Sequence, residues 1–185
     1  MTQPHQVQSR DELEQFYADP DPWKYDDVDD DRQRVARVRA ALPSRTFART
    51  LDIGCGNGFL TEHLPGDELV GVDISERAVE HARARFRDHC PERRATFHAR
   101  SLFELSSSAV GVFDLVVVTG VIYPQYVGRA YSLVTETLRD LLVPGGVMIS
   151  VHIDDWTRYR PPFTLLTVSI DRYRDHFHRL EVLQR

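Results

Sequence analysis

The sequence is poor in cysteine and has no excess of positive charge, and each of these features excludes a class of protein. Its 185 residues contain two cysteines, Cys55 and Cys90, without the dense spacing of small secreted domains, so we expect free thiols in a reducing compartment. The formal net charge is −5, with 23 Lys and Arg residues against 28 Asp and Glu residues. Because no basic excess is available to contact phosphates, no nucleic-acid partner is expected.

Long apolar runs are also missing. The longest, over residues 115–123, is interrupted by Thr119 and Gly120 and is too short to span a bilayer. The first residues, MTQPHQVQSRDEL, lack the apolar centre of a signal peptide. We therefore expect a cytoplasmic protein with no membrane partner. The length favours a single domain over residues 1–185, divided into an N-terminal helical cap (1–45) and a core (46–185).

Segments of strand length alternate with helical patterns from residue 50 onward. Before them, Ser9 and Glu12 have the spacing of a capping box, and a second helix is predicted over residues 31–42. Strands are predicted at residues 50–53, 69–72, 95–99, 113–118, 147–153 and 180–183, and helices at 57–64, 75–88, 131–142 and 170–177. This alternation indicates an α/β fold with a doubly wound, mostly parallel sheet that helices cover on both faces.

Three glycines follow the first predicted strand, in the order Gly54-Cys55-Gly56-Asn57-Gly58. Glycine adopts positive φ and has no Cβ, so a ligand can lie against the backbone of such a loop. Ligands of parallel sheets bind at the carboxyl ends of the strands, where this loop lies. Asp73 ends the second strand and can accept hydrogen bonds from both hydroxyls of a ribose. The pattern predicts a nucleoside cofactor, and either nicotinamide or adenosyl cofactors would use it.

Several motifs resemble those of the class I S-adenosylmethionine-dependent methyltransferases. LDIGCGNGF resembles their first motif, VGVDIS the second, FDLVVVTGVIY the fourth-strand motif and LLVPGGVMIS the segment after it. The resemblance covers residues 51–153 in the order of the family. It implies a Rossmann-like fold, S-adenosyl-L-methionine as cofactor and methyl transfer. The alternative interpretation of the glycine loop is a nicotinamide-dependent oxidoreductase, which would carry G-x-G-x-x-G. The observed G-x-G-x-G spacing disfavours it.

The resemblance also implies which residues hold the methionine end of the cofactor. Asp52 and the backbone from Gly54 to Gly58 would lie there, with the Asp52 carboxylate near the cationic ammonium group. A hydrogen bond that stabilises the loop is the alternative role for Asp52. Thr119 and Gly120, at the end of the fourth strand, would border the same part.

The adenosine end is expected at the second and third strands. Asp73 would bind the ribose hydroxyls, and Ile74 would pack on the adenine. Ser101 stands where family members often carry an acid that pairs with the adenine amino group. Its hydroxyl can accept the same hydrogen bond, or Leu102 can offer its backbone N–H to the ring.

Candidate catalytic residues follow the fourth and fifth strands. His152 could act as a base for a hydroxyl or amine acceptor, although a strand histidine that faces a neighbouring helix is the alternative. Asp154 could hold a substrate amine, and Tyr123 could form one wall of the pocket. No metal-ligand cluster is visible in the sequence. An Asn-Pro-Pro-Tyr signature and a cysteine after the fourth strand are also missing, which disfavours methylation of nucleobases.

The segment before the glycine loop resembles that of a NodS-like subgroup, the nodulation-type N-methyltransferases. Phe16-Tyr17, the stretch from Asp19 to Tyr25, and Ala41-Leu42-Pro43 carry this resemblance. It implies a small acceptor that carries an amine or a sugar, and aromatic residues that close the site against water. We therefore predict methyl transfer to an N or O atom of a small molecule. The alternative is a catalytically inactive module that binds the cofactor for a regulatory or structural role.

The C-terminal part is predicted to contain one strand fewer than the family's sheet of seven. Six strands end at residue 183, so the last strand could be missing and one edge of the sheet open. An open edge is a template for pairing with another chain. Either a homodimer partner or the tail itself would cover it.

Overall fold

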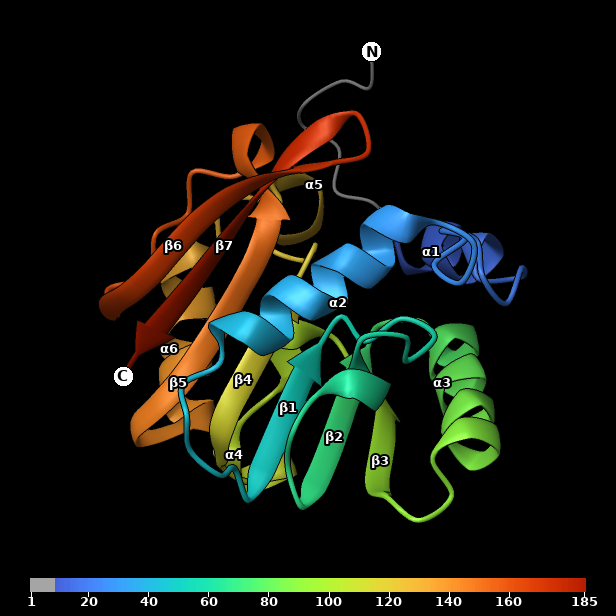
Figure 1. Ribbon diagram of the computed structural model, residues 1–185, viewed down its shortest axis with the longest axis horizontal. Helices are drawn as coiled ribbons and strands as arrows, with labels where there is room; N and C mark the ends of the chain where they lie inside the picture. Colours follow the sequence, from blue (N-terminus) through green and yellow to red (C-terminus); the bar gives the residue numbers. More distant parts are fainter. Residues whose placement is uncertain (1–8) are drawn as a thin grey trace.

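Seven strands form one twisted sheet in the computed structural model, which describes residues 9–185 (Figure 1). The strand order is β3-β2-β1-β4-β5-β7-β6. Pairing is parallel from β3 to β5, and β7 lies antiparallel to both β5 and β6. The strands are β1 (Arg49–Ile53), β2 (Glu68–Asp73), β3 (Arg94–Ala99), β4 (Phe113–Thr119), β5 (Leu142–Ile153), β6 (Thr164–Tyr173) and β7 (His176–Gln184).

Helices cover both faces of this sheet, as the sequence predicts for a doubly wound fold. On one face, Val38 of α2 and Phe86 of α3 belong to a core cluster with Val117 and Ile149 of the sheet. On the other face, Leu138 of α6 joins sheet residues such as Val116 and Met148. The α-helices are α1 (Arg10–Phe16), α2 (Asp29–Ala41), α3 (Glu76–His89), α4 (Ser107–Val110), α5 (Pro124–Val127) and α6 (Tyr131–Leu141). The predicted capping box is present at Ser9, and Ser75 caps α3.

The helix predicted over residues 57–64 is wrong. The glycine loop continues instead into a short 3₁₀ helix, η1 (Thr61–His63). Gly56 and Gly58 have φ values of +53° and +82°, which an α-helix does not contain. The side chain of Asn57 also accepts a hydrogen bond from the backbone N–H of Phe59, which forms a turn.

The helix predicted over residues 170–177 is also wrong, because this segment belongs to the β6–β7 hairpin. Arg174 has a φ of +51° at the turn, and the Ser169 hydroxyl donates to Asp171 rather than capping a helix. β7 pairs with β5 along seven residues and buries Leu180, Val182 and Leu183. This long-range pairing overrides the local helical pattern. The sheet therefore has seven strands instead of the six counted from the sequence, and its last strand is present.

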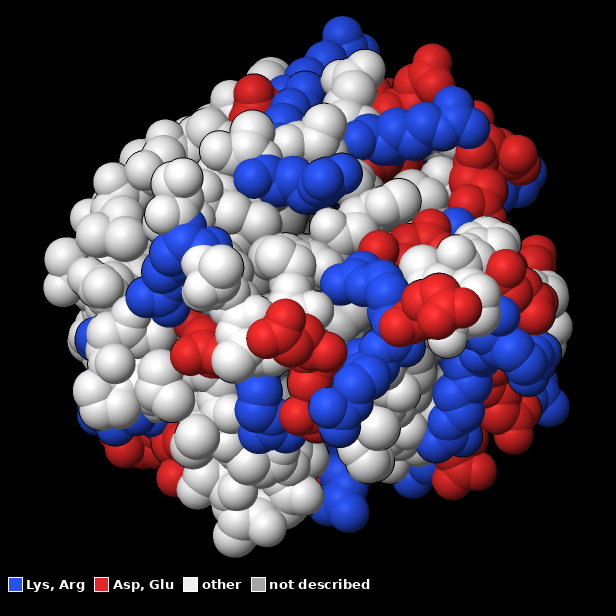
Figure 2. All heavy atoms as spheres, turned by 60° about the horizontal axis from the view of Figure 1, so that its bottom comes forward, with Lys and Arg blue, Asp and Glu red and all other residues white. Residues whose placement is uncertain are grey.

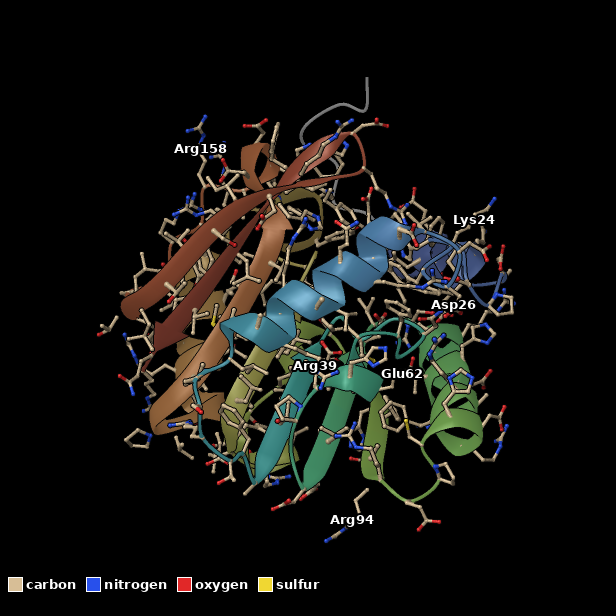
Figure 3. The ribbon with its side chains drawn as sticks, viewed as in Figure 1. Lys24, Asp26, Arg39, Glu62, Arg94 and Arg158 are labelled. Carbon is tan, nitrogen blue, oxygen red and sulfur yellow. The ribbon has the colours of Figure 1, made fainter. Side chains whose placement is uncertain are left out.

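The N-terminal segment is attached to the core by polar contacts. The carboxylate of Glu14 in α1 accepts hydrogen bonds from the hydroxyl of Ser75 and from the backbone N–H of Glu76, at 2.8 and 2.6 Å. Asp26 and Glu62, both labelled in Figure 3, come from this segment and from η1, and both carboxylates bind Arg85 of α3. The segment is thereby fixed over the end of the sheet that carries the glycine loop.

Residues 1–8 lie outside the described residues, and part of the polar N-terminus discussed above falls on them. Within residues 9–185, no helix has the length and apolar character that crossing a membrane requires.

Candidate functional site

The loop after β1 has a backbone that only glycines allow at low cost. Gly54, Gly56 and Gly58 all have positive φ. A Cβ on Gly54 would collide with the side chain of Val121, and one on Gly56 would lie 2.9 Å from the hydroxyl oxygen of Tyr17. The loop is thus a tight turn that packs between Val121, which follows β4, and Tyr17 of the N-terminal segment.

Asp73 fixes this loop from the end of β2. One carboxylate oxygen accepts a hydrogen bond from the backbone N–H of Gly56, and the other accepts from the N–H of Ser75, both at 3.0 Å. The side chain is nearly buried, and burial raises the pKa of Asp73. The backbone donors hold the carboxylate in one orientation at the carboxyl edge of the sheet.

A cavity of about 420 Å³ opens at this edge. It extends from β2 and β3 past the end of β4 to the turn between β6 and β7, and residues of the N-terminal segment line one side. Of the residues predicted from the sequence, the cavity is lined by Gly54, Asp73, Ile74, Ser101, Leu102, Thr119, Gly120 and Tyr123. The predicted residues that do not line it are Asp52, Cys55, Gly56, Asn57, Gly58, His152 and Asp154.

Asp52 lies in the core below the loop and is 1% exposed. One carboxylate oxygen accepts a hydrogen bond from the hydroxyl of Thr61 at 2.6 Å, and the other has no partner among residues 9–185. Burial raises the pKa of Asp52 to about 6. The geometry favours the loop-stabilising alternative for Asp52 over direct contact with a ligand.

His152 is 2% exposed and both of its ring nitrogens have partners. Nε2 lies 3.0 Å from the backbone N–H of Ile122 and accepts its hydrogen, so the neutral ring carries its proton on Nδ1, next to the Ser150 hydroxyl at 3.0 Å. Burial lowers the pKa of His152 to about 3. The contacts argue against the general base that the sequence suggested, and they favour a structural histidine.

Asp154 also lies outside the cavity. Its carboxylate faces the guanidinium groups of Arg160 and Arg179, at 3.8 and 3.9 Å. These pairs occupy the carboxylate on the protein surface, so the geometry does not support a contact with a substrate amine.

Tyr123 is the predicted catalytic candidate that does line the cavity. Its hydroxyl oxygen accepts a hydrogen bond from the backbone N–H of Ile153 at 2.7 Å, which leaves its hydrogen free to donate. Burial raises the pKa of Tyr123 to about 12, so the phenol is neutral near pH 7. Its ring packs edge-on against Trp156, with centroids 5.5 Å apart.

Residues 51–148 match the family described as a methyltransferase domain, and this match covers more than half of the chain. The matched region contains most of β1, the glycine loop, Asp73 and β2 to β4. The chain belongs to this methyltransferase family.

Curated relatives of this methyltransferase share part of its length. A malonyl-[acyl-carrier protein] O-methyltransferase of Legionella pneumophila is 34% identical over 110 residues, which are 51% of this chain and 37% of that protein. A ubiquinone biosynthesis O-methyltransferase of Cereibacter sphaeroides is 34% identical over 115 residues, 60% of this chain and 43% of that protein. The chain thus spans less than half the length of these two relatives.

The fold of the methyltransferase also matches a solved structure over nearly its whole length. The N-methyltransferase NodS from Bradyrhizobium japonicum, in complex with S-adenosyl-L-homocysteine, superposes with a TM-score of 0.80 at 23% identity. The match covers 95% of this chain and 97% of that chain. The class I methyltransferase fold inferred from the sequence motifs is therefore confirmed, and S-adenosylmethionine is the cofactor of this family.

The cavity of the methyltransferase fits this cofactor. A buried carboxylate, Asp73, stands on its wall with apolar side chains of Ile74 and Leu102 nearby, a combination suited to a ribose and an adenine. Ser101 caps the 3₁₀ helix η2 (Leu102–Glu104), where its hydroxyl accepts the N–H of Phe103. Within residues 9–185, no group of three or more His, Cys, Asp or Glu side chains is arranged to hold a metal ion.

Sequence reasoning missed a buried cation in the methyltransferase cavity. Arg34 of α2 lines the cavity and is 8% exposed. One guanidinium nitrogen lies 3.1 Å from the carboxylate of Asp31, and its Nε has no partner among the described residues. The helical spacing offered a signal, because Asp31, Arg34, Val35 and Val38 share one face of the helix.

The turn between β6 and β7 was missed because its segment was predicted to be helical. Arg174 at this turn donates to the carboxylate of Asp31 at 2.6 Å and to the backbone carbonyl of Trp23 at 2.7 Å. The Tyr173 hydroxyl donates to the same carboxylate at 2.7 Å. Asp31 thus joins the turn to the N-terminal segment, and the two together enclose one end of the cavity.

Proposed function

We propose that this methyltransferase moves the methyl group of S-adenosylmethionine to an N or O atom of a small molecule. The observation that carries the proposal is the extent of the cavity. It begins at residues suited to a nucleoside, near Asp73, and continues past Thr119 and Gly120 to an end lined by Tyr123 and Trp156. One cavity therefore offers adjoining places for a donor and for an acceptor.

In this proposal, each group of residues at the cofactor end of the cavity contacts one part of the cofactor. Asp73 binds the ribose hydroxyls, and Ile74 and Leu102 pack against the adenine. Backbone groups of Gly54, with Thr119 and Gly120, border the methionine part. When bound, the cofactor supplies a sulfonium methyl group that a nucleophile takes by direct displacement.

Arg34 completes the cofactor side. Its guanidinium lies on the cavity wall, so it can pair with the carboxylate of the cofactor's methionine part. Asp52 then contributes indirectly. Its carboxylate accepts a hydrogen bond from the Thr61 hydroxyl and stabilises the loop, and it does not contact the ammonium group.

The acceptor side is aromatic. Tyr123, Tyr126, Trp156 and His176 line it, and Trp156 packs edge-on against both Tyr123 and His176. Such walls hold a ring or an apolar face and exclude water, and methyl displacement mainly needs alignment in a dry pocket. A neutral amine acceptor requires no base before transfer. A hydroxyl acceptor can be oriented by the Tyr123 hydroxyl, whose hydrogen remains available.

Comparison with relatives supports both kinds of acceptor atom. The NodS structure carries the name of an N-methyltransferase, and the two curated relatives are named O-methyltransferases. The acidic net charge supports a small molecule over a nucleic acid.

Two measurements test the proposal. Calorimetry with S-adenosylhomocysteine should show one site per chain. Incubation with methyl-labelled S-adenosylmethionine and a panel of aromatic and sugar amines and alcohols should yield at least one labelled product. Binding without transfer to any acceptor class would favour the inactive module instead, and absence of binding would contradict both.

A further inference from the structure

Large apolar side chains are exposed along the C-terminal hairpin. On β6, Leu165, Leu166, Val168 and Ile170 are 48, 47, 42 and 51% exposed, and Phe177 on β7 is 58% exposed. A single exposed apolar side chain is normal on a protein surface. A contiguous group of them marks a surface that another molecule covers.

The pairing register places most of these side chains on one face of the hairpin. Leu165 pairs with Leu183, Val168 with Glu181 and Ile170 with Arg179. These three β7 residues and Phe177 are spaced two apart along the strand, so all of them share one face of the hairpin. We call Leu165, Val168, Ile170 and Phe177 the β6 patch. α6 packs over β4 and β5 on this side of the sheet, and the patch remains exposed beyond them.

The same strand also leaves its backbone open. β6 is the last strand of the sheet, and within residues 9–185 it pairs with β7 alone (Figure 1). Edge strands usually carry charges or proline that block further pairing. From Thr164 to Ile170 the sequence TLLTVSI has neither, and a register shift between Leu165 and Thr167 is its one irregularity. Between residues 164 and 170 the outer edge is therefore open to addition of a strand, whereas the carbonyl of Arg172 further along accepts a hydrogen bond from Arg37 of α2.

We propose that a second copy of this chain adds to the sheet at the β6 edge, with the two β6 strands paired antiparallel across a two-fold axis, so that the exposed apolar side chains of β6 gain neighbours from the other copy. Such pairing satisfies the open backbone groups of both copies at once, since the same edge serves as both partners. With the axis near Val168 and Ser169, the Val168 and Ile170 side chains of each copy meet those of the other.

The distribution of charge on the chain favours a second copy as the partner over a strongly charged molecule. Each copy has a formal net charge of −5, so association of two copies requires a contact that does not bring further like charges together. The left side of Figure 2, where β6 lies in Figure 1, carries few charged side chains, whereas charges of both signs crowd the side of α3. The β6 segment 164–170 meets this requirement, and it offers nothing that would select a strongly acidic or basic partner.

Light scattering coupled to size exclusion tests the proposal over a concentration series. The wild-type chain should have twice its 21.3 kDa mass. Val168→Lys should be a monomer, because two ammonium groups on paired strands would repel each other next to the axis. Ile170→Lys serves as a second variant if the first fails to fold. Val112→Lys, at an exposed apolar residue just before β4, should remain dimeric, because β5 and β7 separate β4 from β6. Unchanged circular dichroism and S-adenosylhomocysteine binding will show that each variant is folded.

Cross-linking tests the geometry directly. Val168→Cys and Ser169→Cys are prepared separately. One of the two variants should form a disulfide dimer on mild oxidation. The wild-type chain controls for its own thiols, of which Cys55 is buried and Cys90 is partly exposed. A monomeric wild-type chain, a dimer that survives Val168→Lys, or a stoichiometric complex with a different protein at this edge would each overturn the proposal. Because cofactor binding is measured in the same samples, a failed dimer is distinguishable from a failed methyltransferase.

Discussion

A carboxylate oxygen of Asp73 accepts the backbone N–H of Gly56 at 3.0 Å. The bond joins two motifs that lie 17 residues apart in the chain, the glycine loop and the end of β2. It holds the loop against the strand that carries the expected ribose ligand, so that the loop and the carboxylate form one rigid edge of the cavity. Cofactor affinity should therefore depend on both residues.

Replacing Asp73 should weaken cofactor binding. Asp73→Ala removes the proposed acceptor for ribose hydroxyls and leaves the N–H of Gly56 without its partner. We expect the affinity for S-adenosylhomocysteine to fall by about 1–3 kcal/mol, the cost of leaving buried polar groups unpaired. Calorimetry measures this, with Asp67→Ala as control because Asp67 is an exposed acid just before the same strand. Equal affinities in the two variants would remove Asp73 from the site.

A side chain at Gly56 should disrupt the loop. In Gly56→Ala the new Cβ would meet the Tyr17 hydroxyl at 2.9 Å and would also require φ of +53°. Gly145→Ala is a matched control, since Gly145 has φ of +75° and a Cβ added there would meet no atom within 4 Å. Both variants carry the backbone penalty of about 1 kcal/mol, and only the first should also lose cofactor affinity. Similar binding by both would mean that contact with Tyr17 does not matter.

Arg34 should recognise the carboxylate of the cofactor. Arg34→Gln should reduce the affinity for S-adenosylhomocysteine by about tenfold or more, the scale of a hydrogen bond to a charged group. Methylthioadenosine, which lacks the amino-acid part, should bind the variant and the wild-type chain alike. A parallel loss for both ligands would indicate that the variant has only loosened the cavity, and Arg32→Gln controls for charge because Arg32 is exposed on the same helix.

His152 should matter for stability and not for proton transfer. His152→Gln keeps a side chain that can accept the N–H of Ile122, so turnover should stay within a few-fold of wild type and the pH profile should keep its shape. Once an acceptor is known, initial rates from about pH 6 to pH 9 measure this. A large fall in turnover with loss of an ionisation near neutral pH would restore His152 as the base.

Stability should fall as the pH is lowered from about 6.5 toward 3. The pKa values of His152 and His178 are lowered by burial to about 3, from 6.5 in an unfolded chain. Between these values the unfolded state binds protons that the folded state does not, so acid favours unfolding. Asp52 has the opposite effect between about 4 and 6, because burial raises its pKa to about 6. Urea denaturation should show a shallower acid loss in His152→Gln than in wild type, and identical slopes would contradict this assignment.

The sequence determined the parts of the fold that depend on local patterns. The apolar runs of β4 and β5, the capping residue Ser75 and the glycine loop all lie where the pattern predicts. Asp73 was also predicted as a site residue, and it does line the cavity, because a residue that ends a parallel strand lies at the edge where ligands bind. These features follow from backbone preferences and from the period of hydrophobic residues.

Tertiary structure alone decided which side chains reach the cavity. Asp52 and His152 occupy positions typical of site residues, yet their side chains turn into the core, where Thr61, Ile122 and Ser150 bind them. Strand pairing placed the predicted helix over residues 170–177 in the end of β6, the turn and the start of β7, and it carried Arg174 to the cavity, 143 residues from its partner Asp31. Side-chain direction and strand pairing depend on neighbours that are distant in sequence, so a local pattern does not encode them.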